Sequence, residues 1–245
     1  MSGNPTLSTT AFNDAGRVIP GEAMTVQGTV NKTAILLILT TLAASYTWHL
    51  FWQGQVGSAS AWLIGGAIGG FVVGLVTTFK KTWSPVTAPL YAVLEGLFLG
   101  GLSSTFERQM PGLVIQAVML TFGTLAALLA AYSAGLIRAS AGFRTGVIAA
   151  TGGIAVVYLV SMVLGFFHIQ IPGIFGNGLI GIGFSLFVVA IAAMNLVLDF
   201  DMIESGARGG APKYMEWYGG FGLLVTLVWL YLEILRLLSK LRSRD

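Results

Sequence analysis

The chain of 245 residues is 55% hydrophobic and only 9% charged, with a formal net charge of +3 and a mean hydropathy of +0.82. Soluble domains carry about 25% charged residues, so this composition excludes a water-soluble globular protein and indicates an integral membrane protein. The absence of cysteine excludes disulfides and thiolate metal sites, and the sequence has no basic stripe interleaved with aromatic residues that would indicate nucleic-acid binding.

The first thirty residues are polar, with Asn, Ser, Thr, Gly and Pro scattered through them. A secretory signal would place an apolar stretch in this region. We therefore expect a flexible tail over residues 1–31, a transmembrane bundle over residues 32–240 and a short basic tail over residues 241–245.

A membrane-spanning helix needs about 20 apolar residues, and seven segments meet this requirement. They are residues 33–52, 59–79, 86–106, 112–137, 146–167, 178–200 and 217–238. Backbone polar groups in lipid must be satisfied within their own segment, so these continuous apolar runs predict helices rather than alternating barrel strands. The expected fold class is an all-α polytopic membrane protein with seven transmembrane helices.

The distribution of Lys and Arg predicts the orientation of these spans. If the N-terminus is cytoplasmic, eight basic residues lie on that side: Arg17, Lys32, Lys80, Lys81, Arg138, Arg144, Arg208 and Lys213. Five lie on the other side: Arg108, Arg236, Lys240, Arg242 and Arg244. The excess favours a cytoplasmic N-terminus. The basic C-terminal tail argues the other way, since seven spans would place it outside.

The second predicted span contains the segment "GGAIGGFVVG". Its glycines form three overlapping GxxxG pairs on one predicted helix face, Gly65 with Gly69, Gly66 with Gly70 and Gly70 with Gly74. Such pairs let two helix backbones approach closely. We expect this span to make a tight contact with a neighbouring helix.

Acidic residues stand out in segments this apolar, because a charge at the middle of a membrane costs about 2.5–3.5 kcal/mol on insertion scales. Glu95 lies near the middle of the third predicted span, with Tyr91 one turn before it. Two interpretations stay open for Glu95. It is either a neutral carboxyl that hydrogen-bonds a neighbouring helix or a functional carboxyl that lines a pathway.

The segment "NLVLDFDMIESG" places two further acids at the predicted end of the sixth span. Asn195 and Asp199 are four residues apart and share a helix face, whereas Asp201 points about 200° away from Asp199. Negative charge at a helix C-terminus opposes the helix dipole. Capping therefore does not explain these acids, which favours a functional role over an ordinary solvated helix end.

Two acids in the last span have structural explanations. Glu216 lies at its start, where the helix dipole favours an acid, and Glu233 lies three residues before Arg236, a spacing that allows an ion pair. No HExxH motif and no nucleophile–base spacing occurs in the sequence. We therefore expect the protein not to be an enzyme.

Four segments together resemble the bacterial branch of the Bax inhibitor-1 proteins, also called transmembrane Bax inhibitor motif proteins. They are "MTVQGTVNKTAILL" (24–37), "APLYAVLEGLFLGGLS" (88–103), "NLVLDFDMIESG" (195–206) and "YMEWYGGFGLLVTLVWLYLEILRLL" (214–238). The resemblance implies six helices around a central C-terminal helix. It also implies a pH-sensitive, calcium-permeable leak, gated by two acids on the sixth and seventh helices that share protons.

The family motif on the sixth helix is an aromatic residue followed by Asp, which Phe200 and Asp201 match. The resemblance thus implies that Asp201 is the first acid of the pair and that Asp199 is an additional acid of this branch.

The second acid has two possible registers. Matching "LYLE" to the family pattern selects Glu233, whereas matching "ILRLL" places Thr226 or its neighbours where the acid belongs. Glu95 or Glu216 could replace the second acid if the fold brings it close.

The leading hypothesis is a channel or leak of the cytoplasmic membrane that carries calcium and needs no cofactor. Asp199, Asp201 and Asn195, with loop carbonyls, would offer calcium a partial, low-affinity site. The alternative is a membrane-embedded regulator that binds a membrane protease or stress-response complex through the glycine-rich second span and the polar tail. Both hypotheses place the protein in a lipid bilayer and neither involves nucleic acid.

Overall fold

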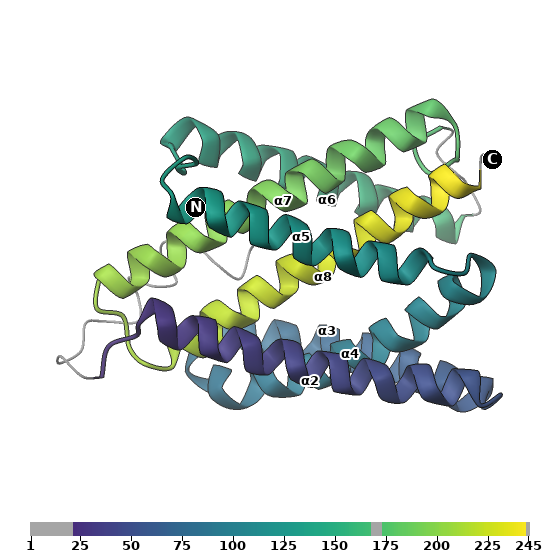
Figure 1. Ribbon diagram of the computed structural model, residues 1–245, viewed down its shortest axis with the longest axis horizontal. Helices are drawn as coiled ribbons and strands as arrows, with labels where there is room; N and C mark the ends of the chain where they lie inside the picture. Colours follow the sequence, from purple (N-terminus) through teal and green to yellow (C-terminus); the bar gives the residue numbers. More distant parts are fainter. Residues whose placement is uncertain (1–21, 168–172, 244–245) are drawn as a thin grey trace. The chain divides into compact units, whose positions relative to one another are not determined.

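The computed structural model describes residues 22–167 and 173–243. Within these ranges, seven helices are long and apolar enough to cross a membrane, which confirms the predicted all-α membrane architecture. They are α2 (Val26–Trp52), α3 (Val56–Phe79), α4 (Ser84–Gln109), α5 (Leu113–Ser133), α6 (Ala141–Phe166), α7 (Leu179–Arg208) and α8 (Met215–Arg242), drawn in Figure 1. A short 3-10 helix, η1 (Lys81–Trp83), precedes α4.

The helices coincide with the predicted spans but differ from them at their ends. α2 begins at Val26, so residues 26–31, which the sequence assigned to the flexible tail, are helical. α7 continues two turns beyond Phe200 to Arg208, and α8 ends at Arg242. Hydropathy marks the apolar part of a helix, whereas capping groups and tertiary contacts decide where the helix begins and ends.

The described residues form two compact units. The first unit contains residues 22–111 and 202–225, and the second unit contains residues 112–201 and 226–243. α7 and α8 each contribute one part to either unit. The sequence predicted one bundle over residues 32–240, and its hydropathy does not indicate this division because both units consist of the same kind of apolar helix.

The last helix is the most buried of the seven spans. In α8, 67% of the most apolar window is buried, whereas in α6 the corresponding share is 11%. The central position that the resemblance implied for this helix stays a prediction.

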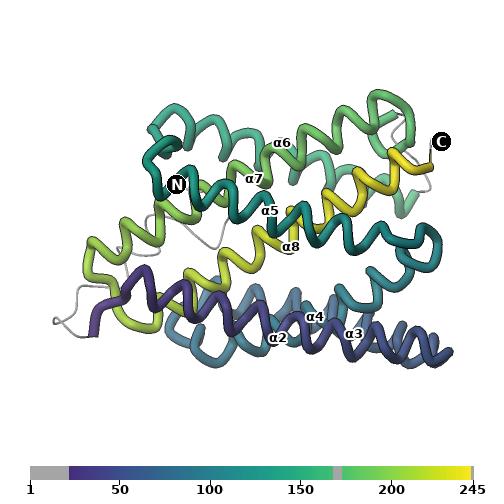
Figure 2. The backbone as a smooth tube through the Cα atoms, viewed as in Figure 1, coloured from purple at the N-terminus to yellow at the C-terminus, as the bar shows by residue number. Residues whose placement is uncertain are grey.

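In the first unit, α4 packs against both α2 and α3, which run beside it in Figure 2. Glycines make the contact with α2 possible. A Cβ atom on Gly96 or Gly100 would collide with the backbone carbonyl oxygen of Thr40 or Ala44 on α2. The two backbones therefore approach as closely as small-residue packing in membranes allows.

The contact between α3 and α4 also depends on glycine. A Cβ atom on Gly66 would lie 2.6 Å from the carbonyl oxygen of Leu94, and one on Gly70 would lie 3.1 Å from the Glu95 carboxylate. The predicted tight contact of the second span is confirmed for these two glycines. Gly65 was placed on the same face, and this is wrong, because a Cβ atom there meets open space. Adjacent helical residues differ by about 100° in direction.

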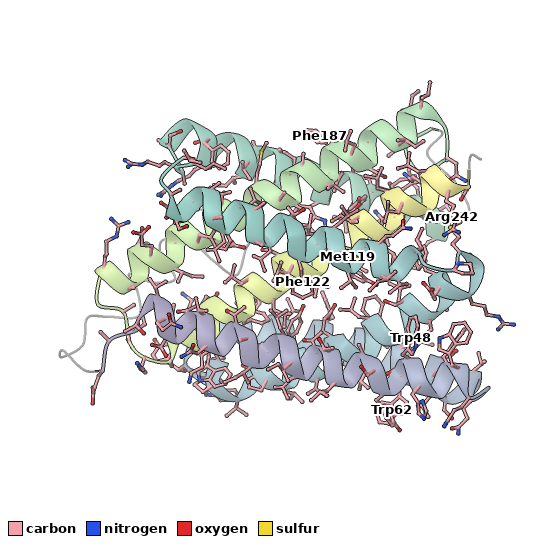
Figure 3. All side chains as sticks on the ribbon, viewed as in Figure 1. Trp48, Trp62, Met119, Phe122, Phe187 and Arg242 are labelled. Carbon is pink, nitrogen blue, oxygen red and sulfur yellow. The ribbon has the colours of Figure 1, made fainter. Side chains whose placement is uncertain are left out.

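Large apolar side chains are exposed along the helices. Met119 and Phe122 on α5 are 68% and 46% exposed, and Phe187 on α7 is 48% exposed; Figure 3 shows their positions. In water such exposure would be unfavourable, but acyl chains solvate apolar side chains as well as a protein core does. These surfaces therefore face lipid.

The neighbouring glycines of α3 allow a matched test of the contact. Gly66→Ala should destabilise the protein by about 1–3 kcal/mol, because the added methyl group overpacks the contact with α4. Gly65→Ala adds the same methyl group beside open space, so it should be neutral or slightly stabilising. Thermal unfolding of each variant in detergent, followed by tryptophan fluorescence, measures the difference. Equal effects of the two substitutions would contradict the packing described for α3.

Candidate functional site

Three polar side chains lie along one face of α6, which belongs to the second unit. Arg144, Thr151 and Tyr158 are spaced seven residues apart, which is close to two full helical turns, so they lie on one face. Successive members are about 10 Å apart along the helix axis. Val147 and Ile154 are buried between them. We call these three residues the α6 polar row.

The first member of the row pairs with Asp201 on α7. The guanidinium of Arg144 forms an ion pair with the Asp201 carboxylate, and its Nε donates to the carbonyl oxygen of Ala139 at 3.1 Å. The Asp201 side chain is 15% exposed. Sequence analysis counted Arg144 among the loop cations, but it lies inside α6. It also expected an acid beside Asp201, and the structure places a cation there.

The second member of the row contacts Asn195. The Asn195 amide nitrogen donates to the Thr151 hydroxyl at 2.8 Å and to the carbonyl oxygen of Ile191 at 2.9 Å. In the described residues, the Asn195 side-chain oxygen is fully buried and has no hydrogen-bond donor. Asp199 lies one turn further along α7 and is 0% exposed. The two residues are therefore buried together on one face, as their spacing predicts.

The position of these acids within α7 corrects one argument from the sequence. Asp199 and Asp201 were placed at the C-terminal end of the sixth span, where they would oppose the helix dipole. α7 continues to Arg208, and Glu204 and Arg208 form an ion pair 3.6 Å long in its last turns. The dipole effect is confined to the last turn. It therefore does not explain, or argue against, either aspartate.

The third member of the row belongs to a cluster with Glu233 and Arg236 on α8. The Tyr158 hydroxyl donates to Glu233 Oε1 at 2.9 Å and accepts a hydrogen bond from Arg236 Nη1 at 2.7 Å. Arg236 Nη1 also donates to Glu233 Oε1 and Oε2 at 3.0 and 3.2 Å. The Arg236 guanidinium lies 5.2 Å from the centre of the Tyr158 ring. The predicted ion pair of Glu233 with Arg236 is confirmed.

An apolar core separates the second and third members of the row. Ile154, Val188 and Ile191 form its centre, and the partly buried side chains of Ala150, Tyr158, Phe184 and Trp229 pack against it. The polar contacts of the second unit are therefore held at separate levels along the helices. Each level places a carboxyl or an amide of α7 or α8 opposite α6.

Glu95 belongs to the first unit. It lies in the middle of α4, where its carboxylate faces Gly70 of α3. Tyr91, one turn before Glu95 on the same helix, packs its ring edge-on against Phe221 with a centroid distance of 4.9 Å. Glu95 therefore lies at the contact between α4 and α3, and both interpretations of it stay open.

The predicted calcium ligands lie in different surroundings. Asp199 is buried beside Asn195, whereas Asp201 is paired with Arg144. Within residues 22–167 and 173–243, no group of three or more His, Cys, Asp or Glu side chains is arranged to hold a metal ion. A joint calcium site at Asp199 and Asp201 stays a prediction.

Sequence analysis missed the α6 polar row. Tyrosine and threonine are common in spans and Arg144 lay outside the predicted fifth span, so none of the three residues stood out alone. The spacing of seven residues was the available signal, because it places all three on the one face of α6 that is buried.

Comparison with known proteins identifies the family. The model of the family described as Bax inhibitor 1 like matches residues 4–243, so the chain belongs to this family. Comparisons with curated proteins and with solved structures found no match.

The hydroxyl of Tyr158 allows a test of the cluster with Glu233 and Arg236. Tyr158→Phe removes a group that both donates and accepts in this cluster, and it should destabilise the protein by about 1–3 kcal/mol. Thermal unfolding in detergent measures the loss. Tyr46→Phe is the control, because Tyr46 is 49% exposed and should tolerate the change. A loss no larger than that of the control would show that the hydroxyl does not hold α6 to α8.

Proposed function

We propose that this member of the Bax inhibitor-1-like family is a pH-sensitive, calcium-permeable leak of the cytoplasmic membrane. The observation that carries the proposal is the burial of two acids in one unit, Asp199 on α7 and Glu233 on α8, which are 0% and 2% exposed. Ionisable residues within spans are costly, and they commonly mark ion or proton pathways. Membership of the family supports the same function.

Protonation gives these acids a way to control passage. At acid pH a buried carboxyl is neutral and attracts no cation. Loss of the proton places a negative charge in a medium of low dielectric constant, where it either separates the helices or draws in a cation. The leak should therefore be closed at acid pH and open as pH rises.

Calcium suits the oxygen groups of the second unit as a passing ion. It takes six to eight oxygen ligands, and Asp199, the Asn195 side-chain oxygen and the Thr151 hydroxyl provide a few of these on adjacent faces of α7 and α6. Water would have to supply the remainder. A site so incomplete binds weakly, which permits release and therefore transport rather than storage.

Arg144 and Arg236 add competition to this mechanism. Each guanidinium already occupies a carboxylate that a cation would need, Asp201 in one case and Glu233 in the other. A cation can use these carboxylates only when the arginine moves aside. We propose that the two ion pairs keep the leak small.

Calcium flux tests this mechanism. The full-length protein in vesicles loaded with a calcium-sensitive dye should show flux that rises from mildly acidic to mildly alkaline pH. Asp199→Asn should flatten this dependence, because an amide cannot lose a proton. Glu204→Gln is the matched control, since Glu204 lies on the same helix but is 44% exposed, and it should keep the wild-type profile. Wild-type flux equal to that of empty vesicles would refute the leak itself. A wild-type profile in Asp199→Asn would refute only the gating.

We further propose that the N-terminus is cytoplasmic, as the excess of basic residues on that side favours. The chain has no cysteine, so single cysteines can be introduced directly. Gln53→Cys, in the loop after α2, should react with a membrane-impermeant maleimide on intact cells. Lys81→Cys, after α3, should react only after permeabilisation. The reverse pattern would show the opposite orientation.

A further inference from the structure

The first turn of α2 contains no acidic residue. Thr25 is the N-cap of α2, with an extended backbone, and its hydroxyl oxygen accepts the backbone N–H of Gly28 at 2.8 Å. In a capping box, the third helical residue is Glu or Gln, and its side chain returns to the N–H of the N-cap residue. Gly28 occupies that third position and has no side chain.

Glu216 of α8 supplies the missing carboxylate. The backbone N–H of Thr25 and the Thr25 hydroxyl each donate to Glu216 Oε1 at 3.0 Å. Lys213 Nζ lies 3.0 Å from the same oxygen, and the Glu216 side chain is 1% exposed. The two polar groups of the N-cap residue are thus satisfied from another helix, 191 residues away in the sequence.

Gly28 leaves the space that this carboxylate fills. A Cβ atom on Gly28 would overlap the Glu216 carboxyl group, closer than real Cβ atoms approach other atoms. An acid on α2 at this position and the acid on α8 therefore exclude each other. The chain has the acid on α8.

The chain before α2 is held at the same place by backbone pairing. The backbone N–H of Met24 donates to the carbonyl oxygen of Ala211 at 2.7 Å. The backbone N–H of Lys213 donates to the carbonyl oxygen of Glu22 at 2.9 Å. Ala23 and Pro212 form an antiparallel bridge between these bonds. Met24 is buried, with only 2% of its surface exposed.

Charges near the start of α8 support this arrangement. Glu216 lies in the first turn of α8, where an acid is favourable toward the positive end of that helix's own dipole. One carboxylate therefore serves the N-termini of two helices. Beside it, the Lys32 ammonium lies 5.0 Å from the centre of the Trp217 ring, which adds a second contact between α2 and α8.

We propose that Glu216 completes the capping box of α2 from α8, and that this shared cap is a latch between the first and last spans. Movement of the N-terminal end of α8 away from α2 exposes the Thr25 N–H and removes the carboxylate half of the capping box, while the Thr25 hydroxyl still accepts the Gly28 N–H. The latch is independent of the leak proposed above, because it follows from the contacts of the first unit alone. It makes the start of the first span a reporter of the position of the last span.

Moving the acid from position 216 on α8 to position 28 on α2 distinguishes the capping of α2 from its attachment to α8. Glu216→Ala should speed hydrogen exchange of the first-turn amides of α2 by about fivefold, as expected for the loss of an N-cap partner. The double variant Gly28→Glu, Glu216→Ala returns the acid to α2 and should restore the protection of these amides. Glu22→Gln is the matched control, because Glu22 contributes its backbone carbonyl to this contact, and it should not change exchange. All measurements use the full-length protein in detergent micelles.

Disulfide formation then reports the latch itself. Ala23→Cys with Pro212→Cys, in a chain that has no other cysteine, should cross-link readily under mild oxidation. In this cysteine-pair background, Glu216→Ala should slow cross-linking several-fold. Gly28→Glu together with Glu216→Ala should slow it by the same factor, because this change caps α2 again but does not restore the contact with α8. Three results would overturn the proposal: unchanged exchange in Glu216→Ala, failure of the double variant to regain protection, or cross-linking in the double variant at the original rate. If Glu216→Ala does not fold, Glu216→Gln in the same assays decides between these outcomes.

Discussion

A hydrocarbon environment offers no hydrogen bonds, so every polar group within a span must find its partner inside the protein. The second unit meets this requirement at the first and third members of the α6 polar row. Asp201 meets Arg144 and Glu233 meets Tyr158 and Arg236. α6 buries little apolar surface, and association of helices in lipid has little hydrophobic driving force. Its attachment therefore depends on these polar contacts as well as on its narrow packed stripe.

The first unit meets the same constraint by removing side chains instead of pairing them. Gly96 and Gly100 bring the backbone of α4 against α2, and Gly66 brings α3 against α4. Contacts of this kind gain from dispersion between closely packed atoms and involve no ionisable group. Glu95 is the exception in the middle of α4, where its carboxylate faces Gly70 of α3. Close backbone packing thus dominates the contacts among α2, α3 and α4, whereas polar side-chain contacts join α6 to α7 and α8.

Hydropathy predicted the seven spans because the length and apolarity of a span are set by the bilayer, which acts on each segment separately. The ends of the helices are set by contacts between segments, and there the predictions were less accurate. The start of α2 at Val26 depends on Glu216, which lies 191 residues from Thr25 in the sequence. The N-terminal tail therefore had no local signal showing that its last residues are helical.

The acids were recognisable from the sequence because charges in spans are rare, but their partners were not. A search for partners among the acids leads to a shared proton, whereas the structure places arginines beside Asp201 and Glu233. This difference changes what a cation must do to enter. Where two acids share a proton, a cation competes with that proton for the carboxylate, and the proton can dissociate into solvent. Beside an arginine, it competes with a tethered charge that returns as soon as the cation departs. A tethered competitor keeps the carboxylate neutralised, which allows charged groups to stay within a span and, in the leak proposed above, would make passage slow.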